Sequence, residues 1–132
     1  MREAGIGAAR LLVVDDNKVN RLLLTRSLEL QGHRVATAEN GRVALEMLRR
    51  ESFDLLLLDM EMPGLSGPDT AALIRAAESE DPEQPRLPIL ALTANTRPEA
   101  VEACMRSGMD GHLAKPFERQ DLEASMARLA HM

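Results

Sequence analysis

Polar side chains suited to phosphate or metal chemistry follow four apolar segments of this 132-residue chain. They are the acidic pair Asp15-Asp16, then Asp59, Thr93 and Lys115. Each type has an ordinary explanation by itself, because Asp or Asn after a strand often caps the next helix, and capping is the favoured reading of Asp15 or Asn17 taken alone. Three carboxylates, a hydroxyl and an ammonium at the ends of separate strands are harder to explain as caps, so the set points to one site.

These groups suit a divalent cation and a phosphoryl group. Two carboxylates ~4 Å apart repel each other by about 4 kcal/mol at an effective dielectric of 20, so three crowded carboxylates need a counter-ion. A set of oxygen ligands without Cys or His favours Mg²⁺ or Mn²⁺ over zinc. The charges of three carboxylates, the metal and Lys115 sum to zero, and a dianionic group can then bind. Transfer of that group in line to a carboxylate gives an acyl phosphate.

Short apolar runs alternate with longer segments of helical spacing, which predicts five strands and five helices. We expect the strands, buried on both faces, at Leu11–Val14, Val35–Ala38, Asp54–Leu58, Ile89–Leu92 and His112–Ala114. We expect the helices at Lys18–Leu30, Arg42–Arg50, Asp69–Ala77, Pro98–Arg106 and Arg119–Ala130. Asn40 is a predicted N-cap, and Gly32 and Gly108 are predicted to end their helices.

This alternation predicts an α/β fold in which helices cover both faces of a five-stranded parallel sheet, a doubly wound (βα)5 three-layer sandwich. Ligands of such sheets bind beyond the carboxyl ends of the strands, where the polar groups stand. We expect a single domain over residues 10–132 after a tail of residues 1–9. The acidic run from Glu78 to Glu83 is predicted to be a solvated loop.

Composition excludes several other classes of function. The net charge of −5 and the absence of Tyr and Trp argue against a nucleic-acid surface or an aromatic cage. The single cysteine, Cys104, excludes an internal disulfide or a thiolate metal cluster, and we expect it to pack in the interior. Without an apolar run of ~20 residues or a signal-like start, the sequence predicts a cytoplasmic domain that makes no membrane contact.

The chain resembles the response-regulator receiver domain, a flavodoxin-like fold, over nearly its whole length. The motifs that carry the resemblance are Asp15-Asp16, Leu55-Leu56-Leu57-Leu58-Asp59-Met60-Glu61-Met62-Pro63-Gly64, Ala91-Leu92-Thr93-Ala94 and Gly108-Met109-Asp110-Gly111-His112-Leu113-Ala114-Lys115-Pro116. By resemblance, Asp59 is the phosphoacceptor, and its phosphoryl group comes from a phosphohistidine of a histidine kinase or phosphotransfer protein. Such a domain accepts a phosphoryl group and changes conformation, and it is not itself a turnover enzyme.

The resemblance also implies roles for individual residues. Asp16, Asp59 and the backbone carbonyl of Glu61 would bind Mg²⁺, with Mn²⁺ as a substitute, and Asp15 would act through a metal-bound water. Thr93 and Lys115 would hold phosphoryl oxygens, and the Lys115–Pro116 bond is expected to be cis.

Details such as the segment Val14-Asp15-Asp16-Asn17-Lys18-Val19-Asn20 are most similar to receivers of hybrid sensor histidine kinases, although a stand-alone regulator stays open. A partner would then dock on the first helix and on the loop at Pro116-Phe117, and homodimerisation stays open. The docking candidates on the helix are Val19, Asn20, Leu22 and Leu23. Core packing is the alternative for the two leucines.

Two positions depart from the usual receiver pattern. His112 stands where most receivers carry Tyr or Phe, three residues before the lysine, so we expect either a different switch partner for Thr93 or an imidazole without a switching role. Glu61 places a carboxylate two residues after Asp59, where it can repel the phosphoryl group or an attacking water.

Two other functions remain as alternatives. A phosphatase with an aspartyl nucleophile usually needs a second carboxylate two residues on, and Glu61 has that spacing. A receiver-fold interaction module independent of phosphorylation is the other, although every phosphorylation residue is present.

Overall fold

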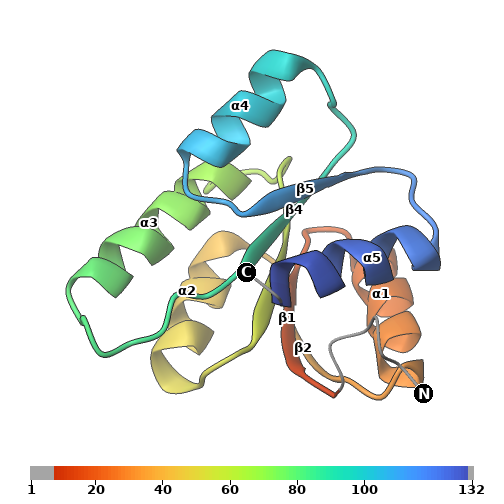
Figure 1. Ribbon diagram of the computed structural model, residues 1–132, viewed down its shortest axis with the longest axis horizontal. Coiled ribbons are helices and arrows are strands. Elements are labelled where there is room, and N and C mark those ends of the chain that lie inside the picture. The colour runs from red at the N-terminus through yellow and green to blue at the C-terminus, as the bar shows by residue number, and fades with distance from the viewer. Residues whose placement is uncertain (1–7, 131–132) are drawn as a thin grey trace.

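The computed structural model describes residues 8–130, so most of the expected tail and the last two residues of the expected domain lie outside the described part. Five strands alternate with five helices along the chain (Figure 1). The strands are β1 (Arg10–Val14), β2 (Arg34–Ala38), β3 (Leu55–Asp59), β4 (Ile89–Thr93) and β5 (Gly111–Ala114). The helices are α1 (Lys18–Leu30), α2 (Gly41–Arg50), α3 (Gly67–Ser79), α4 (Pro98–Arg106) and α5 (Arg119–Ala130).

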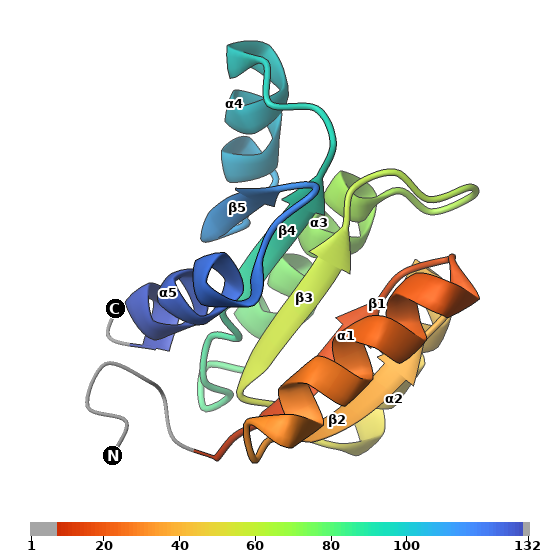
Figure 2. The ribbon, with the colours of Figure 1, turned by 90° about the vertical axis from the view of Figure 1, so that its right-hand side faces the viewer.

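All five strands are parallel and form one sheet in the order β2-β1-β3-β4-β5. Figure 2 shows α1 and α5 on one face of the sheet, with α2, α3 and α4 on the other. The order reverses direction after β2, which makes the fold doubly wound. The predicted α/β class and the five-stranded parallel sheet are therefore confirmed.

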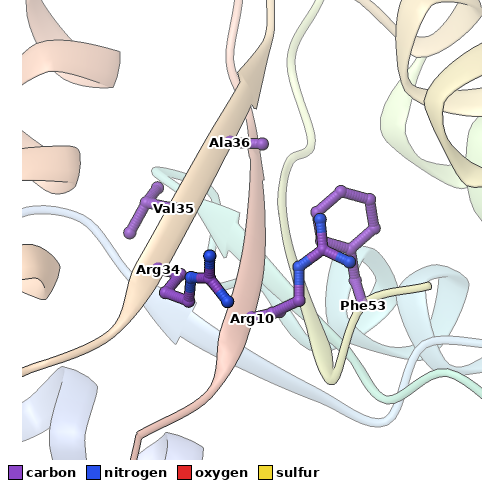
Figure 3. A pocket seen from close by; sticks show the side chains of 5 residues that line it. All are labelled: Arg10, Arg34, Val35, Ala36 and Phe53. Atoms are coloured by element: carbon purple, nitrogen blue, oxygen red, sulfur yellow. The ribbon is translucent and has the colours of Figure 1, made fainter. Parts of the chain in front are cut away.

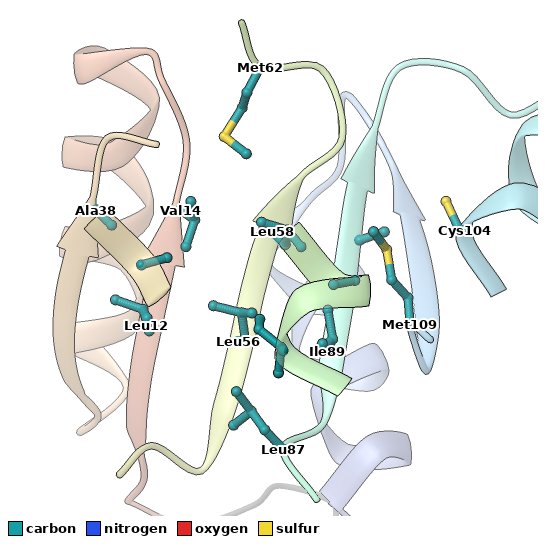
Figure 4. Close-up of a cluster of buried hydrophobic side chains, with 14 residues drawn as sticks. Leu12, Val14, Ala38, Leu56, Leu58, Met62, Leu87, Ile89, Cys104 and Met109 are labelled. Carbon is teal, nitrogen blue, oxygen red and sulfur yellow. The ribbon is translucent and has the colours of Figure 1, made fainter. Parts of the chain in front are cut away.

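The core lies on both faces of the three central strands. Alternate residues of β1, β3 and β4 enter opposite layers, and nearly all of them are apolar. Leu12, Leu56 and Ile89 pack towards α2 and α3 (Figure 4), whereas Leu11 and Leu57 pack towards α1 and α5. This two-sided burial explains why the central strands appear in the sequence as continuous apolar runs without alternation.

The two outer strands are less buried than the sequence predicted. In β5 every residue is only half-buried, and in β2 only Ala38 is buried. An outer strand has a neighbour on one side alone, so solvent reaches its free edge. The expectation of burial on both faces was therefore wrong for β2 and β5.

Local signals set the ends of the helices. The side chains of Asn17, Asn40 and Ser66 each accept a backbone N–H in the first turn of α1, α2 and α3. Gly32 and Gly108 follow α1 and α4 with positive φ angles of 96° and 106°, as predicted. Helix α3 begins two residues before the predicted start, because Ser66 supplies the cap and proline is well tolerated in the first turn.

Helix α3 also runs further than predicted and takes in Glu78, which corrects the view of this residue as part of a solvated loop. Its carboxylate accepts bonds from Arg75 at 2.8 Å and from the backbone N–H of Leu87 at 2.8 Å. Only 12% of the Glu78 side chain is exposed. Burial with a guanidinium and a backbone donor removes it from solvent, while the rest of the run stays exposed.

Glu78 belongs to a network that we call the basal clasp, formed by Arg75, Glu78, Arg86 and Asp110. The Asp110 carboxylate accepts from Arg75 at 2.8 Å, from Arg86 at 2.7 Å and from the backbone N–H of Ile89 at 2.8 Å. The Arg75 Nε–H donates to the Gly108 carbonyl at 2.8 Å. The basal clasp thus joins α3, the start of β4 and the turn before β5.

Helix α1 exposes apolar side chains to solvent. Val19, Leu22 and Leu23 are 62%, 53% and 62% exposed, and the inner face of the helix is carried by residues such as Leu28. Core packing of Leu22 and Leu23, the alternative considered from sequence, is therefore wrong. Among residues 8–130, no helix combines the length and apolar character that a bilayer crossing requires.

Candidate functional site

The structure brings the predicted polar groups to one edge of the sheet. Asp15 and Asp16 follow β1, Asp59 and Thr93 are the last residues of β3 and β4, and Lys115 follows β5. Because these strands are parallel and adjacent in the order β1-β3-β4-β5, their carboxyl ends meet at the same edge. A crevice beyond these strand ends is where doubly wound sheets bind ligands.

Three carboxylates form an acidic cluster. Ligand oxygens of Asp15, Asp16 and Asp59 all lie within 4.8 Å of one another, with Asp15 and Asp59 buried and Asp16 exposed. Asp15 Oδ1 accepts the backbone N–H of Asn17 at 2.8 Å. Its Oδ2 is buried and has no hydrogen-bond partner among the residues that the structure describes. A buried carboxylate oxygen without a partner is costly, and a hard divalent cation would satisfy it, so the cluster fits Mg²⁺.

Asp59 is held by two donors. Lys115 Nζ lies 3.1 Å from Asp59 Oδ1, and the backbone N–H of Glu61 donates to the same oxygen at 3.2 Å. Burial raises the pKa of the Asp59 carboxyl, the Lys115 hydrogen bond lowers it, and the charge of Asp15 raises it again, with a net rise. Lys115 therefore favours the ionised, nucleophilic form of a carboxyl group whose burial favours protonation.

Thr93 is engaged by Glu61, a contact that the sequence did not predict. The Thr93 hydroxyl donates to Glu61 Oε2 at 3.0 Å and also lies 3.2 Å from the Asn95 carbonyl oxygen. It accepts the backbone N–H of Asn95 at 2.9 Å. The Glu61 carboxylate thus lies on the hydroxyl that the family resemblance assigns to the phosphoryl group.

The remaining predicted positions lie on β5 and in the turn after it. The Lys115–Pro116 peptide bond is cis. His112 is half-buried on the outer strand, in register with Ala91 of β4. It therefore lies in the sheet next to the strand that ends in Thr93.

The residues that pack around the end of strand β3 are in close contact. Cys104 of α4 is 1% exposed, and its Sγ lies 3.5 Å from Met60 Sδ. This burial confirms the predicted packing role. Burial and then the charge of Glu61 raise the pKa of the Cys104 thiol. A Cβ at Gly67 would lie 2.7 Å from the Asp59 carbonyl oxygen and 2.8 Å from Met60 Cα, so α3 starts in close contact with this peptide.

A hollow of about 370 Å³ lies at the other end of β1 and β2 (Figure 3). Its walls are formed by Arg10, Arg34, Val35, Ala36 and Phe53. The Arg10 guanidinium lies 4.9 Å from the centre of the Phe53 ring and is paired with Glu51. None of the acidic cluster lines this hollow, so the candidate site is the open edge of the sheet instead.

Comparison with known proteins agrees with the geometry. The family model described as the response regulator receiver domain matches residues 11–127. The chain belongs to this family. This receiver domain is 43% identical over 115 residues to the sensor histidine kinase GacS of Pseudomonas protegens, covering 87% of the chain and 12% of GacS. It is 39% identical over 126 residues to the virulence sensor protein BvgS of Bordetella pertussis, covering 92% of the chain and 10% of BvgS. The receiver domain thus spans about one eighth of the length of GacS and one tenth of BvgS.

Solved structures extend the comparison. The receiver domain of the sensor histidine kinase PA1611 of Pseudomonas aeruginosa, with magnesium coordinated in its active site cleft, is 34% identical with a TM-score of 0.83. That match covers 96% of this chain and 100% of the other. The receiver domain of Ssk1 of Saccharomyces cerevisiae, solved with the histidine phosphotransfer protein Ypd1, is 26% identical with a TM-score of 0.87. It covers 93% of this chain and 89% of the other.

Proposed function

We propose that this receiver domain accepts a phosphoryl group from a phosphohistidine onto Asp59. The observation that carries the proposal is a buried Asp59 at 3.1 Å from Lys115, within an acidic cluster at the sheet edge. In the transfer, a carboxylate oxygen of Asp59 forms the new P–O bond while the P–N bond of the donor breaks and its imidazole leaves. The domain is then a phosphoacceptor that promotes its own modification.

The residues around Asp59 would have separate roles in binding the cation and the phosphoryl group. Asp16, Asp59 and the Glu61 carbonyl would hold Mg²⁺, with Asp15 acting through a bound water, as the family resemblance implies. The ion would offset the negative charge of the phosphoryl oxygens. Lys115 is the cationic side chain beside Asp59, and its ammonium group would shift from Asp59 to a phosphoryl oxygen. The Thr93 hydroxyl would leave Glu61 to bind another.

The partner would be a histidine kinase or a histidine phosphotransfer protein. The Ssk1 receiver was solved with such a protein, and exposed apolar side chains on α1 supply a surface for one. The docking surface would comprise Val19, Asn20, Leu22 and Leu23 with Pro116-Phe117. Leu22→Asp is expected to slow transfer from the protein donor while leaving modification by a small phosphodonor unchanged. A loss with both donors would contradict a docking role.

The relatives suggest the setting of the domain. Because GacS and BvgS are sensor proteins of which the chain spans a small part, we propose the receiver of a hybrid histidine kinase working on the cytoplasmic side. Any kinase activity would then belong to the larger protein. The receiver unit would comprise residues 10–132, although Ala9 is buried and its N–H donates to His33 Nδ1 at 3.1 Å.

The test is phosphorylation of the purified chain by phosphoramidate with Mg²⁺, followed by intact-mass measurement and by transfer profiling against phosphohistidine proteins. We expect one phosphoryl group on the wild type and on Asp54→Asn, and none on Asp59→Asn. Asp54 is a matched control because it directly precedes the same strand and binds the Arg10 N–H. An unmodified wild type would favour an interaction module, and steady release of phosphate from a generic ester would favour a phosphatase.

A further inference from the structure

Arg21 of α1 returns to the end of strand β1. Its Nη1 donates to the backbone carbonyl oxygen of Asp15 at 2.7 Å, and the side chain is half-buried there. A charged donor at this distance makes a strong hydrogen bond. Arg21 is not among the residues that the resemblance assigned to the chemistry, yet it contacts the backbone of one of them.

This contact completes the fixation of Asp15. The Asp15 N–H donates to the Ala38 carbonyl at 3.2 Å, and Asp15 Oδ1 accepts the Asn17 N–H at 2.8 Å. Asn17 in turn caps α1 and accepts the Arg21 N–H through its own carbonyl at 3.0 Å. With its N–H, carbonyl and Oδ1 all bonded, Asp15 keeps a single buried oxygen, Oδ2, without a partner in the part of the chain that the structure describes.

We propose that Arg21 is a positioning residue for the divalent cation site. By holding the Asp15 carbonyl, its guanidinium fixes the peptide that joins Asp15 to Asp16, and so sets where both side chains leave the backbone. A preformed ligand set binds a cation more tightly because less ordering accompanies binding. The inference rests on the proposed function, since it assigns Asp15 and Asp16 to the cation.

The positive charge of Arg21 has the opposite effect on Mg²⁺ affinity from its positioning role, so the two roles predict different outcomes. A guanidinium charge near the cluster repels a cation, so a purely electrostatic role would mean that removing Arg21 tightens Mg²⁺ binding. Salt suppresses that repulsion, since the screening length is about 4 Å at 0.5 M ionic strength, whereas the orientation of the turn is not screened. Affinity at high salt therefore reports on positioning.

The experiment is a Mg²⁺ titration of the full chain at 0.5 M KCl, monitored through the NMR shifts of the backbone amides. The wild type is compared with R21M, R21K and the control variant R26M. Arg26 is exposed and lies five residues further along the same helix. We expect R21M to raise the Kd for Mg²⁺ by roughly 3- to 10-fold and R26M to change it by less than twofold. R21K keeps a charged donor of similar reach and is expected to remain within threefold of the wild type.

Phosphorylation by phosphoramidate gives the second readout. At saturating Mg²⁺ the rate of R21M should return to within twofold of wild type, because the ordering defect is then overcome by the bound cation. Unchanged or tighter Mg²⁺ binding by R21M would overturn the proposal, as would an R21K variant as weak as R21M. A wild type that binds no Mg²⁺ would instead reject the proposed site itself, and the inference with it.

Discussion

The first prediction concerns Asp59→Asn, which is expected to stabilise the metal-free domain while abolishing phosphorylation. Asp59 is 3% exposed and carries a charge beside two other carboxylates. Burial raises the pKa of the Asp59 carboxyl, the hydrogen bond from Lys115 lowers it, and the charge of Asp15 raises it. The net rise means that the folded environment disfavours the ionised form of Asp59. A neutral amide of the same shape avoids that penalty and still offers an oxygen to Lys115.

The magnitude follows from the spacing of the acids. At 4.8 Å, the upper limit of the separation between ligand oxygens in the cluster, two unit charges repel by about 0.9 kcal/mol at a dielectric of 80 and by about 3.5 kcal/mol at 20. Lost attraction to Lys115 offsets part of this gain. We therefore expect Asp59→Asn to raise the free energy of unfolding by about 1–3 kcal/mol near pH 7 in EDTA.

The stability difference between Asp59→Asn and the wild type is expected to depend on pH. Because the pKa of folded Asp59 is raised above its ordinary value of 3.8, the folded chain binds more protons than the unfolded chain between the two values. The stability of the wild type therefore falls as the pH rises through that window, and the full penalty is present above it. The advantage of Asp59→Asn should thus be largest near neutrality and disappear below about pH 4.

The free energies of unfolding of the wild type and Asp59→Asn can be measured over this pH range by urea unfolding, monitored by circular dichroism. Glu83→Gln is the control for loss of an exposed charge. Saturating Mg²⁺ should narrow the difference, because a cation that binds the folded wild type stabilises it by mass action. The reasoning would be refuted if Asp59→Asn were less stable than wild type in EDTA at neutral pH, since the Lys115 pair would then outweigh the burial and repulsion.

Three further predictions concern Glu61, His112 and the basal clasp. Glu61→Gln removes a negative charge beside Asp59. We expect this variant to be phosphorylated by phosphoramidate faster and to lose its phosphoryl group by hydrolysis faster, each by roughly 2- to 5-fold, because the repulsion removed is near 0.5–1 kcal/mol. An unchanged half-life of the phosphorylated form, measured by intact mass, would count against this role. His112→Ala is expected to alter the NMR shift changes that accompany phosphorylation, and an unchanged pattern would show that the imidazole takes no part in switching. Arg75→Met removes the cation paired with the nearly buried Glu78 and one of the two cations paired with Asp110, and should lower the free energy of unfolding by about 3–5 kcal/mol. Arg50→Met, which breaks an exposed pair with Glu46, should lower it by less than 1 kcal/mol; equal urea midpoints for the two variants would contradict the assigned burial.

Much of the fold could be predicted from the sequence because the strands and helix ends are marked by residues close to them in the chain. Continuous apolar runs mark the central strands, and Asn17, Asn40, Gly32 and Gly108 mark helix ends by side-chain or backbone requirements that depend on a few neighbours. The parallel order then followed from the strand–helix alternation, and it placed the polar residues together.

The errors arose where a property depends on distant neighbours. Nothing near Glu78 in the sequence indicates that the carboxylate accepts the N–H of Leu87, nine residues on, so it looked like part of a solvated run. The leucines of α1 have helical spacing on two faces, and sequence alone could not say which face lies inward. The Glu61–Thr93 contact joins residues 32 positions apart and depends on the side-chain conformation of an exposed carboxylate.

Gly67 shows that the position of Asp59 also depends on a residue outside the acidic cluster. The space beside it is already filled by the peptide that joins Asp59 to Met60, so a methyl group added there would force this peptide or the start of α3 to move. A related chain with every acid, the threonine and the lysine intact, but with a larger residue at this position, would still match the motifs while the end of β3 or the start of α3 lay in a different place. The information that defines a working receiver therefore includes the absence of a side chain.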